Sequence, residues 1–396
     1  MLIGVVGKPN VGKSTFFKAL TLMDVYIANF PFATIKPNHG TASVRIECVD
    51  KEFGKQCNPR MGTCTNGTRF VPVDLLDVAG LVPGAYKGLG LGNQFLNDLN
   101  MADALIHVID ASGSTSEKGE PVPAGSYDPA DDVRFLETEL DMWYLGLIKT
   151  GWEKFARTVM QTKANISKSV AKQLSGLRVT EDMVVDAIKN LKLPEDIMSW
   201  KDGELLQLAA SLRKKTKPIV IAANKIDIPS AENNLHRLKE LFPDFKIIPC
   251  SAESELALKE AAKNGLIKYS PGDSKFEVIG NLNERQKAAL DFVRKDILEK
   301  YGSSGVQEVI DYAVLNLLGY IAIYPGGVNK LTDSKGNTLP DCFLMPGNST
   351  ALDFAYRLHT DFGKNFIKAI DVKTKMAIGK EHKLKHRDVI EIAAGK

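Results

Sequence analysis

The stretch LIGVVGKPNVGKST, residues 2–15, decides the fold of this chain. A short apolar run comes directly before Gly7 and Gly12, and a helical pattern begins at Ser14. The two glycines allow consecutive backbone N–H groups to turn inward around phosphate oxygens. The helix that follows directs the positive end of its dipole at the same anion. The spacing Gly-x-x-x-x-Gly-Lys-Ser therefore predicts a phosphate-binding loop between a strand and a helix.

Two side chains of this loop are expected to carry charge and metal chemistry. Lys13 would place a positive charge on the β- and γ-phosphates of a nucleotide, and the Ser14 hydroxyl would ligate Mg²⁺. The rest of the loop would contact phosphate oxygens through inward-turned N–H groups. The predicted nucleotide contacts here are Gly7, Asn10, Val11, Gly12, Lys13, Ser14 and Thr15.

Composition is typical of a globular protein. The 396 residues are 44% hydrophobic and 25% charged, with a formal net charge of +3, so we expect two or three domains and a sizeable core. Because the net charge is small, any nucleic-acid partner must be met by local basic patches. No apolar run approaches the length of a membrane span, and the chain opens with a strand pattern rather than a leader. We therefore expect a cytoplasmic protein without a membrane partner, and we favour a monomer.

The five cysteines, Cys48, Cys57, Cys64, Cys250 and Cys342, fit no disulfide framework of a small secreted protein. Cys57 and Cys64 bracket a turn, and Cys48 is close to them in sequence. A zinc site here would need a fourth ligand and a tighter Cys-x-x-Cys spacing. We therefore expect reduced thiols, and a disulfide stays open if the source is a hyperthermophile.

Short apolar runs separated by helical or glycine-rich stretches organise the chain, at residues 2–6, 71–76, 104–109, 218–223 and 246–249. Runs of this kind are typical of buried parallel strands, so we predict an α/β fold with a doubly wound sheet. The stretch between the third and fourth runs is too long for a structureless loop and shows helical periodicity. It is predicted to be an inserted helical domain.

These patterns predict four parts. The phosphate-binding domain is discontinuous, over residues 1–119 and 214–280, and the helical insertion covers residues 120–213. A helical connector follows at residues 281–319. From Tyr320 the chain alternates strand patterns with turn signals around one helix, which predicts a β-grasp module over residues 320–396.

A second motif follows the strand pattern at residues 71–76. Asp77 and Gly80 form D-x-x-G, in which the carboxylate holds Mg²⁺ through water and the glycine N–H meets the γ-phosphate. Thr34 lies between the two motifs and is the candidate hydroxyl that joins Mg²⁺ when the γ-phosphate is present. The predicted catalytic residues are Lys13, Thr34 and Gly80, and the predicted metal ligands are Ser14, Thr34 and Asp77.

A third motif selects the base. Asn224, Lys225 and Asp227 form N-K-x-D at the end of an apolar strand pattern. The Asp227 carboxylate can accept from guanine N1–H and the 2-amino group, whereas adenine has neither donor, and such a site discriminates by roughly 10⁴ to 10⁵. Asn224 is expected to tie this motif to the phosphate loop, and the Lys225 stem to cover the base. At the end of the last strand, Ser251 and Ala252 would present the Ala252 N–H to guanine O6, so we predict GTP and GDP as ligands.

These residues resemble the motifs of the Obg-related GTPases, and of the YchF-like branch in particular. The resemblance rests on GKPNVGKS at residues 7–14, NFPFATIKPN at 29–38 and DVAGLVPG at 77–84. The tail, with LDFAYRLH at 352–359 and DVIEI at 388–392, is similar to a TGS domain, which is a β-grasp module. Branch members best known for ATP use carry Asn-x-x-Glu as the base motif. The intact N-K-x-D of this chain therefore predicts guanine specificity.

The resemblance also bears on hydrolysis. Leu81 stands where many GTPases have the Gln that orients water, so intrinsic hydrolysis should be slow, on the order of 10⁻⁴ to 10⁻² s⁻¹, until a partner accelerates it. Asn10 resembles the Asn that helps relatives bind K⁺ beside the phosphates. The alternative is that Asn10 only stabilises the loop. Mg²⁺ is the expected cofactor, and K⁺ stays open.

Two basic regions indicate where a partner would bind. One run in the insertion has no acidic residue and contains Lys154, Arg157, Lys163, Lys168, Lys172 and Arg178. A second region contains Lys373, Lys375, Lys380, Lys383, Lys385 and Arg387. Such side chains can contact RNA phosphates, although a charge run is more often a solvated face. Together with the family's association with ribosomes, they favour a ribosome or RNA partner.

Three functions follow from these observations. The first is a GTP-hydrolysing molecular switch that acts on ribosomes or in translation. The second is a nucleotide-gated binding scaffold in which hydrolysis is incidental. The third is an ATPase of the same fold, and Asp227 argues against it.

Overall fold

The structure is a computed structural model that describes residues 1–22, 38–78, 84 and 98–395. Its internal contacts divide the chain into two compact units. The first is Met1–Gly40 with Asp74–Val309, and the second is Thr41–Val73 with Ile310–Lys396. Residues 41–73 therefore group with the C-terminal part of the chain. The predicted domain boundaries, which place these residues in the phosphate-binding domain, stay a prediction.

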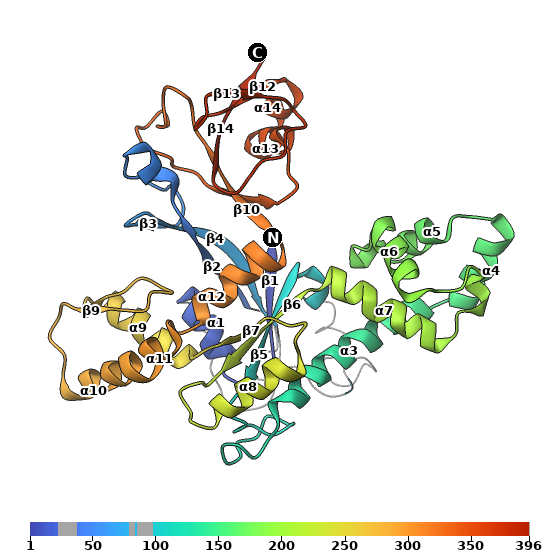
Figure 1. The fold of residues 1–396 in the computed structure, drawn as a ribbon, viewed down its shortest axis with the longest axis horizontal. Helices are drawn as coiled ribbons and strands as arrows, with labels where there is room; N and C mark the ends of the chain where they lie inside the picture. The colour runs from blue at the N-terminus through green and yellow to red at the C-terminus, as the bar shows by residue number, and fades with distance from the viewer. Residues whose placement is uncertain (23–37, 79–83, 85–97, 396) are drawn as a thin grey trace. The chain divides into compact units, whose positions relative to one another are not determined.

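A mainly parallel sheet has the strand order β2-β4-β1-β5-β6-β7, with β3 beside β4 (Figure 1). β1 pairs in parallel with β4 and β5, and β6 pairs in parallel with β5 and β7. β5 and β6 are buried along their whole length, as strands covered on both faces must be. The strands are β1 (Leu2–Val6), β2 (Asn38–Glu47), β3 (Thr63–Thr65), β4 (Thr68–Asp77), β5 (Ala104–Asp110), β6 (Ile219–Asn224) and β7 (Ile247–Pro249).

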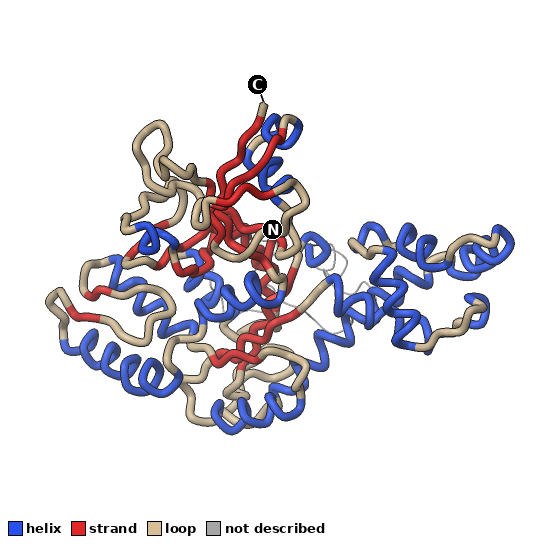
Figure 2. The backbone as a smooth tube through the Cα atoms, turned by 45° about the horizontal axis from the view of Figure 1, so that its top comes forward, coloured by secondary structure: helices blue, strands red, loops and turns tan. Residues whose placement is uncertain are grey.

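Helices lie on either side of these strands (Figure 2). α3 and α8 share one buried apolar cluster with the sheet, in which Leu136 and Leu238 meet strand residues such as Ile221. α1 packs against α9 instead. The helices are α1 (Lys13–Thr21), α3 (Pro129–Lys149), α8 (Ala231–Leu241) and α9 (Ala252–Lys263). The predicted doubly wound α/β fold is confirmed.

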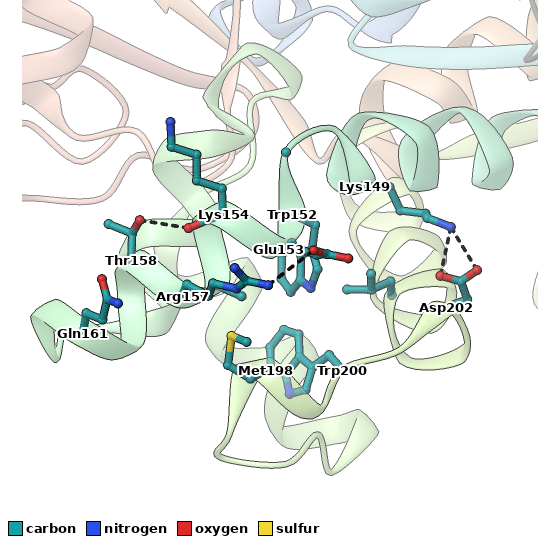
Figure 3. Close-up of a pocket in the computed structure, with 13 residues that line it drawn as sticks. Lys149, Trp152, Glu153, Lys154, Arg157, Thr158, Gln161, Met198, Trp200 and Asp202 are labelled. Carbon is teal, nitrogen blue, oxygen red and sulfur yellow. Dashed lines mark hydrogen bonds and ion pairs between the residues drawn. The ribbon is translucent and has the colours of Figure 1, made fainter.

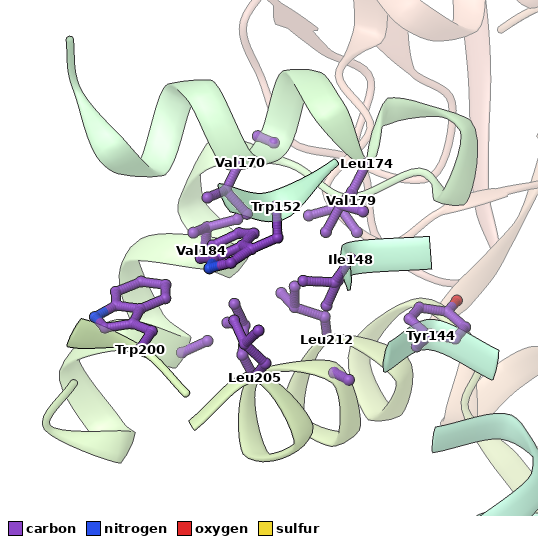
Figure 4. Close-up of a cluster of buried hydrophobic side chains, with 14 of the residues drawn as sticks. Tyr144, Ile148, Trp152, Val170, Leu174, Val179, Val184, Trp200, Leu205 and Leu212 are labelled. Atoms are coloured by element: carbon purple, nitrogen blue, oxygen red, sulfur yellow. The ribbon is translucent and has the colours of Figure 1, made fainter. Parts of the chain in front are cut away.

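One long helix joins the sheet to the helical insertion. The first half of α3 buries Val133 and Leu140 against the sheet, and its second half buries Tyr144 and Ile148 in a separate apolar core. Figure 4 shows that core, where side chains from several insertion helices meet. The predicted helical insertion is therefore confirmed as a region with its own core. Its elements are α4 (Trp152–Thr162), α5 (Ile166–Gln173), η3 (Ser175–Leu177), α6 (Glu181–Leu191), η4 (Ile197–Ser199) and α7 (Asp202–Thr216).

Short elements follow α9. Asn283 begins α10 with a capping box, in which its side chain and that of Gln286 each accept from the other residue's N–H. In this part of the chain Ile267, Leu290 and Val293 pack with Leu258 of α9 in one buried cluster. The elements after α9 are β8 (Ile267–Lys268), β9 (Glu277–Val278), α10 (Glu284–Phe292), η5 (Val293–Leu298), α11 (Glu299–Tyr301), α12 (Val306–Asp311) and η6 (Tyr312–Leu317).

The second unit contains a five-stranded sheet of order β11-β10-β14-β12-β13. β10 and β14 pair in parallel, and the other neighbours are antiparallel. Phe354 of α13 packs into the core of this sheet, which is the predicted β-grasp arrangement. The expected single helix is divided at His359, which ends α13 and caps α14. The elements are η1 (Val49–Phe53), β10 (Tyr320–Pro325), β11 (Phe343–Pro346), α13 (Ala351–Leu358), α14 (Thr360–Lys364), β12 (Phe366–Asp371), β13 (Met376–Ile378) and β14 (Asp388–Ala394).

No helix in the described ranges is long and apolar enough to cross a membrane.

Candidate nucleotide-binding site

The loop between β1 and α1 is shaped for an anion. Gly12 has a φ of 88°, and a Cβ there would come within 2.3 Å of the Asn224 amide nitrogen. Gly7 lies against β5, where a Cβ would meet the Val108 carbonyl oxygen at 2.4 Å. Gly12, as the N-cap of α1, offers no side-chain cap, and the first turn contains no acidic residue. The first N–H groups of α1 are therefore left for an anion.

The end of β4 brings a carboxylate to this loop. The Lys13 ammonium forms an ion pair with Asp77 Oδ1, and both side chains are buried. Asp77 Oδ2 is buried as well and has no hydrogen-bond partner in the described part of the chain. A buried oxygen without a donor is costly, and carboxylate oxygens are the ligands that Mg²⁺ prefers. The residues present therefore fit a magnesium ion at this point.

Asn224 connects the base motif to the phosphate loop. It is buried at the end of β6, and its Nδ2 donates to the Val11 carbonyl oxygen at 2.9 Å. Its Oδ1 accepts from the Ala252 N–H at 3.0 Å. The Ala252 N–H, which the sequence predicts for guanine O6, is therefore already engaged by Asn224. Ser251 Oγ donates to Asp227 Oδ1 at 2.9 Å and so orients that carboxylate.

Lys225 reaches the loop that follows β5. Its ammonium lies 2.9 Å from Asp110 Oδ2. Asp110 is buried and also accepts from the hydroxyls of Ser112, Ser114 and Thr115. This carboxylate therefore fixes the Lys225 side chain. Asp110, the last residue of β5, is a functional candidate that the three sequence motifs do not include, although a carboxylate at the end of an apolar strand pattern indicates such a role.

The same loop also holds the phosphate loop, which the sequence did not predict. Asn10 Nδ2 donates to the Gly119 carbonyl oxygen at 2.8 Å. Lys8 donates to the Thr115 carbonyl oxygen at 3.0 Å and pairs with Asp132, at the start of α3, at 2.8 Å. Asn10 was expected either to bind K⁺ or to stabilise the loop. The structure shows a loop-stabilising contact, and K⁺ binding stays a prediction.

Burial dominates the titration of this cluster. Burial, with a contribution from the Lys8 charge, lowers the pKa of His107 to about 3. Burial raises the pKa of Asp132 to about 6, against the opposing effect of Lys8. Burial also lowers the pKa of Lys8, against Asp132. A buried pair with these opposed shifts positions its loops at a desolvation cost and is weak support for stability.

Two predicted site residues, Thr34 and Gly80, lie outside the described residues. Their predicted roles toward Mg²⁺ and the γ-phosphate therefore stay predictions. The structure does bring together the other candidates of the three motifs, from Gly7 to Thr15, Asp77, Asn224 to Asp227, and Ser251 with Ala252.

The basic side chains of the insertion differ in their partners. Arg178 pairs with Asp103 and donates to the Met101 carbonyl oxygen at 3.2 Å, so it holds the insertion to the chain just before β5. Arg157 lies 3.7 Å from Glu153 on α4. The exposed positions of this run without a carboxylate partner among the described residues are Lys154, Lys163, Lys168 and Lys172.

The basic residues near the end of the sequence are partly neutralised within the second unit. Lys373 pairs with Glu52 at 2.7 Å. Arg387 pairs with Glu47 at 2.9 Å and also contacts Glu52. Lys375, Lys380, Lys383 and Lys385 are exposed and have no carboxylate partner among the described residues, so each of the two basic regions keeps four such side chains.

The insertion also contains a pocket of about 960 Å³. The indole rings of Trp152 and Trp200 stack in its wall, with centroids 5.9 Å apart. Figure 3 shows Lys154 and Arg157 of α4 around the same pocket. None of the predicted nucleotide contacts lines it. The pocket therefore belongs to the insertion and not to the nucleotide site.

The fold and these motifs define a P-loop nucleotide-binding protein with a C-terminal β-grasp module. Comparisons with known families agree. Residues 2–131 match the family described as 50S ribosome-binding GTPase. Residues 222–327 match the Obg-like GTPase YGR210-like, G4 motif-containing domain, and residues 334–394 match the TGS domain.

Similar proteins extend over nearly the whole chain. A GTP-binding protein of Methanocaldococcus jannaschii is 50% identical over 396 residues, which is 99% of each chain. The ribosome-binding ATPase YchF of Mycoplasma genitalium is 33% identical over 92% of this chain and 86% of its own. The crystal structure of a GTP-binding protein from Pyrococcus horikoshii OT3 covers 100% of both chains, with 38% identity and a TM-score of 0.79. The chain belongs to the Obg-like GTPases, in the branch that includes YchF.

Proposed function

We propose that this protein binds GTP, hydrolyses it to GDP and phosphate, and acts as a molecular switch on ribosomes in the cytoplasm. The observation that carries the proposal is the double contact of Asn224 with Val11 and Ala252. It holds base recognition by Asp227 at a fixed distance from phosphate binding by Lys13. A nucleotide that satisfies both must have a guanine base and a β-phosphate.

Asp227 supplies the base preference. Its carboxylate, oriented by Ser251, accepts from guanine N1–H and the 2-amino group. Adenine would leave the carboxylate charge without a hydrogen-bond donor. A binding site rejects a ligand most strongly when that ligand leaves one of its polar groups unpaired. Asn224 already engages the Ala252 N–H, so contact with guanine O6 requires that N–H to be shared.

Lys13 and Asp77 change partners when the nucleotide binds. In the structure they neutralise each other. Phosphate oxygens would compete for the Lys13 ammonium and free the Asp77 carboxylate. Mg²⁺ would be held by Ser14 and Thr34, and through water by Asp77, and it would supply charge neutralisation at the β- and γ-phosphates.

Hydrolysis needs further groups from this chain. Lys13 and the Gly80 N–H would stabilise charge on the γ-phosphate. Leu81 offers no polar group to orient the attacking water, so turnover of the isolated protein would be slow. Asn10 is the candidate for K⁺ binding next to the phosphates. A partner that orders the site would therefore set the rate.

A ribosome is the partner that the relatives favour, because the YchF protein of Mycoplasma genitalium is named ribosome-binding. On this chain, the exposed lysines Lys163, Lys168 and Lys172 would contact RNA phosphates. The competing function is ATP hydrolysis, since that same relative is named an ATPase. A further candidate is a nucleotide-gated scaffold in which hydrolysis is incidental.

Competition binding against a fluorescent GDP analogue tests the base preference. GTP should displace the analogue at a concentration at least 100-fold lower than ATP. In Asp227→Asn an amide donor replaces one acceptor, which suits the 2-oxo group of xanthine, so the variant should lose GTP and gain xanthosine triphosphate. Asp244→Asn, at an exposed position, is the matched control. Equal displacement by ATP and GTP would overturn guanine specificity, and an unchanged preference in Asp227→Asn would overturn the role of Asp227.

A further inference from the structure

Four metal-binding side chains converge at the end of β2, and the nucleotide site uses none of them. Cys48 follows β2, Asp50 lies in η1, Cys57 in the next loop and Cys64 in β3. One ligand atom from each lies within 4.8 Å of the other three. Cys48 Sγ is 3.5 Å from Cys57 Sγ, and Cys64 Sγ is 3.7 Å from Asp50 Oδ2.

These separations fit a tetrahedral ion. Thiolates bound to one Zn²⁺ at about 2.3 Å stand about 3.8 Å apart. Three cysteines with one carboxylate are a soft, four-membered ligand set, which suits zinc and not magnesium or calcium. The expectation that a zinc site here lacks a fourth ligand is corrected by Asp50. The sequence alone does not indicate these four ligands, because the cysteines are not spaced as Cys-x-x-Cys and the fourth ligand is an aspartate.

Backbone hydrogen bonds orient the carboxylate of Asp50. Its Oδ1 accepts from the Lys51 N–H at 2.8 Å, and its Oδ2 accepts from the Cys57 N–H at 3.1 Å. Asp50 has a relative exposure of 1%. Outer hydrogen bonds that fix a ligand in this way are a usual part of metal sites.

Arg69 provides an independent indication of negative charge on the sulfurs. Its side chain is fully buried, and its Nη1 lies 3.6 Å from Cys57 Sγ. Its other partners are the carbonyl oxygens of Leu339 and Pro340, and it forms no ion pair with a carboxylate of the described chain. A buried guanidinium needs a compensating charge. Three thiolates and a carboxylate around a divalent cation carry a net negative charge that Arg69 would offset.

The segment around these residues has little apolar packing and is held mainly by polar contacts, such as the ion pair of Arg60 with Asp333 at 2.8 Å. Between Lys51 and Gly62 only Cys57 is buried, and most other positions are exposed. Met61 is 68% exposed. A loop that buries sulfur and carboxylate but almost no hydrocarbon has little hydrophobic stabilisation, and structural zinc commonly stabilises such segments.

We propose that this cluster binds one Zn²⁺ as a structural site, with the ligands Cys48, Asp50, Cys57 and Cys64. Binding releases the thiol protons to solvent and closes residues 48–64 into a fixed loop. The competing state is a disulfide between Cys48 and Cys57. That state would leave three of the five thiols free after unfolding without reductant.

Metal analysis of the full-length protein tests the site. Protein dialysed against Zn²⁺ and then against metal-free buffer should retain one zinc per chain by plasma mass spectrometry. Its unfolded, metal-stripped chain should show all five thiols. Cys57→Ser should lose the zinc, and Cys250→Ser, which removes a buried thiol outside the cluster, should retain it. No bound zinc, or only three free thiols, would overturn the proposal.

Cobalt substitution identifies the ligands even if Cys57→Ser folds poorly. Co²⁺ in the wild-type site should show the intense visible bands of tetrahedral coordination and a near-ultraviolet thiolate-to-cobalt band. Asp50→Asn should shift the visible bands and keep the thiolate band. Cys342→Ser should leave both spectra unchanged. If Cys342→Ser abolishes the spectrum and Asp50→Asn does not alter it, the assignment of Asp50 as the fourth ligand is wrong.

Discussion

Asn224 Nδ2 donates a hydrogen bond of 2.9 Å to the carbonyl oxygen of Val11, so a residue of the base motif is joined directly to the phosphate loop. The two segments are far apart in sequence: the phosphate loop follows β1 and Asn224 ends β6, and these strands lie on either side of β5 in one sheet. Because the same side chain accepts from Ala252, one amide holds three segments of the site. Base and phosphate recognition are therefore coupled.

Removing this amide should weaken nucleotide binding. In Asn224→Ala the Val11 carbonyl and the Ala252 N–H lose their partner, and each unsatisfied buried group costs about 1–3 kcal/mol. We expect at least a tenfold loss of GDP affinity by titration calorimetry. Asn283→Ala, which removes the N-cap of α10 and costs about 1 kcal/mol, should leave GDP affinity unchanged. Wild-type affinity in Asn224→Ala would contradict the coupling.

Asp77→Asn should separate the two roles of this carboxylate. Without nucleotide the variant leaves the Lys13 charge buried and uncompensated, which destabilises by about 3–5 kcal/mol and lowers the thermal midpoint. With nucleotide, Mg²⁺ should no longer raise the affinity for GTP. The matched control is Asp74→Asn, an exposed carboxylate on the same strand. A magnesium effect as large as in the wild type would argue against Asp77 as a metal-site residue.

His107 should make stability depend on pH. Its pKa in the folded state is about 3, below the ordinary value near 6.5, so the unfolded chain binds more protons between these pH values. The free energy of unfolding therefore decreases as pH falls below about 6.5, by about 1.4 kcal/mol per pH unit. Urea unfolding of His107→Gln at pH 7, 6 and 5 should show a correspondingly smaller loss than the wild type. The exposed His236→Gln should follow the wild type, and parallel curves for His107→Gln would refute the assignment.

Lysines of the insertion should contact RNA phosphates if the partner is a ribosome. The double variant Lys163→Glu with Lys168→Glu should lose co-sedimentation with ribosomes while its GTP turnover in isolation stays unchanged. Lys189→Glu with Lys192→Glu makes the same charge change at the C-terminal end of α6 and should still co-sediment. Binding that survives reversal of Lys163 and Lys168 would exclude this part of the insertion as the contact.

Local sequence signals predicted the fold and which of the candidate site residues lie close together. A strand followed by Gly7, Gly12 and Lys13 is encoded within one short stretch, and strand ends bring Asp77 and Asn224 to the same edge of a parallel sheet by topology. The apolar runs predicted the sheet because buried parallel strands must be continuously hydrophobic.

Contacts between residues far apart in the chain could not be predicted from local sequence signals. The pairing of Lys8 with Asp132 and the contact of Asn10 with Gly119 join residues separated by a hundred positions or more. No local pattern records such contacts, because they depend on how loops meet after the sheet forms. Asp50 was not predicted as a metal ligand for a related reason, since the cysteines of its cluster approach it only in the folded chain.

The most direct test of the proposed function is the initial rate of GTP hydrolysis in K⁺ buffer, with and without purified ribosomes. The isolated protein should turn over slowly, on the order of 10⁻⁴ to 10⁻² s⁻¹, and ribosomes should raise the rate by several powers of ten. ATP should be a poor substrate under both conditions. A rate that stays slow at saturating ribosomes, or an ATP rate equal to the GTP rate, would contradict a guanine-specific switch that acts on the ribosome.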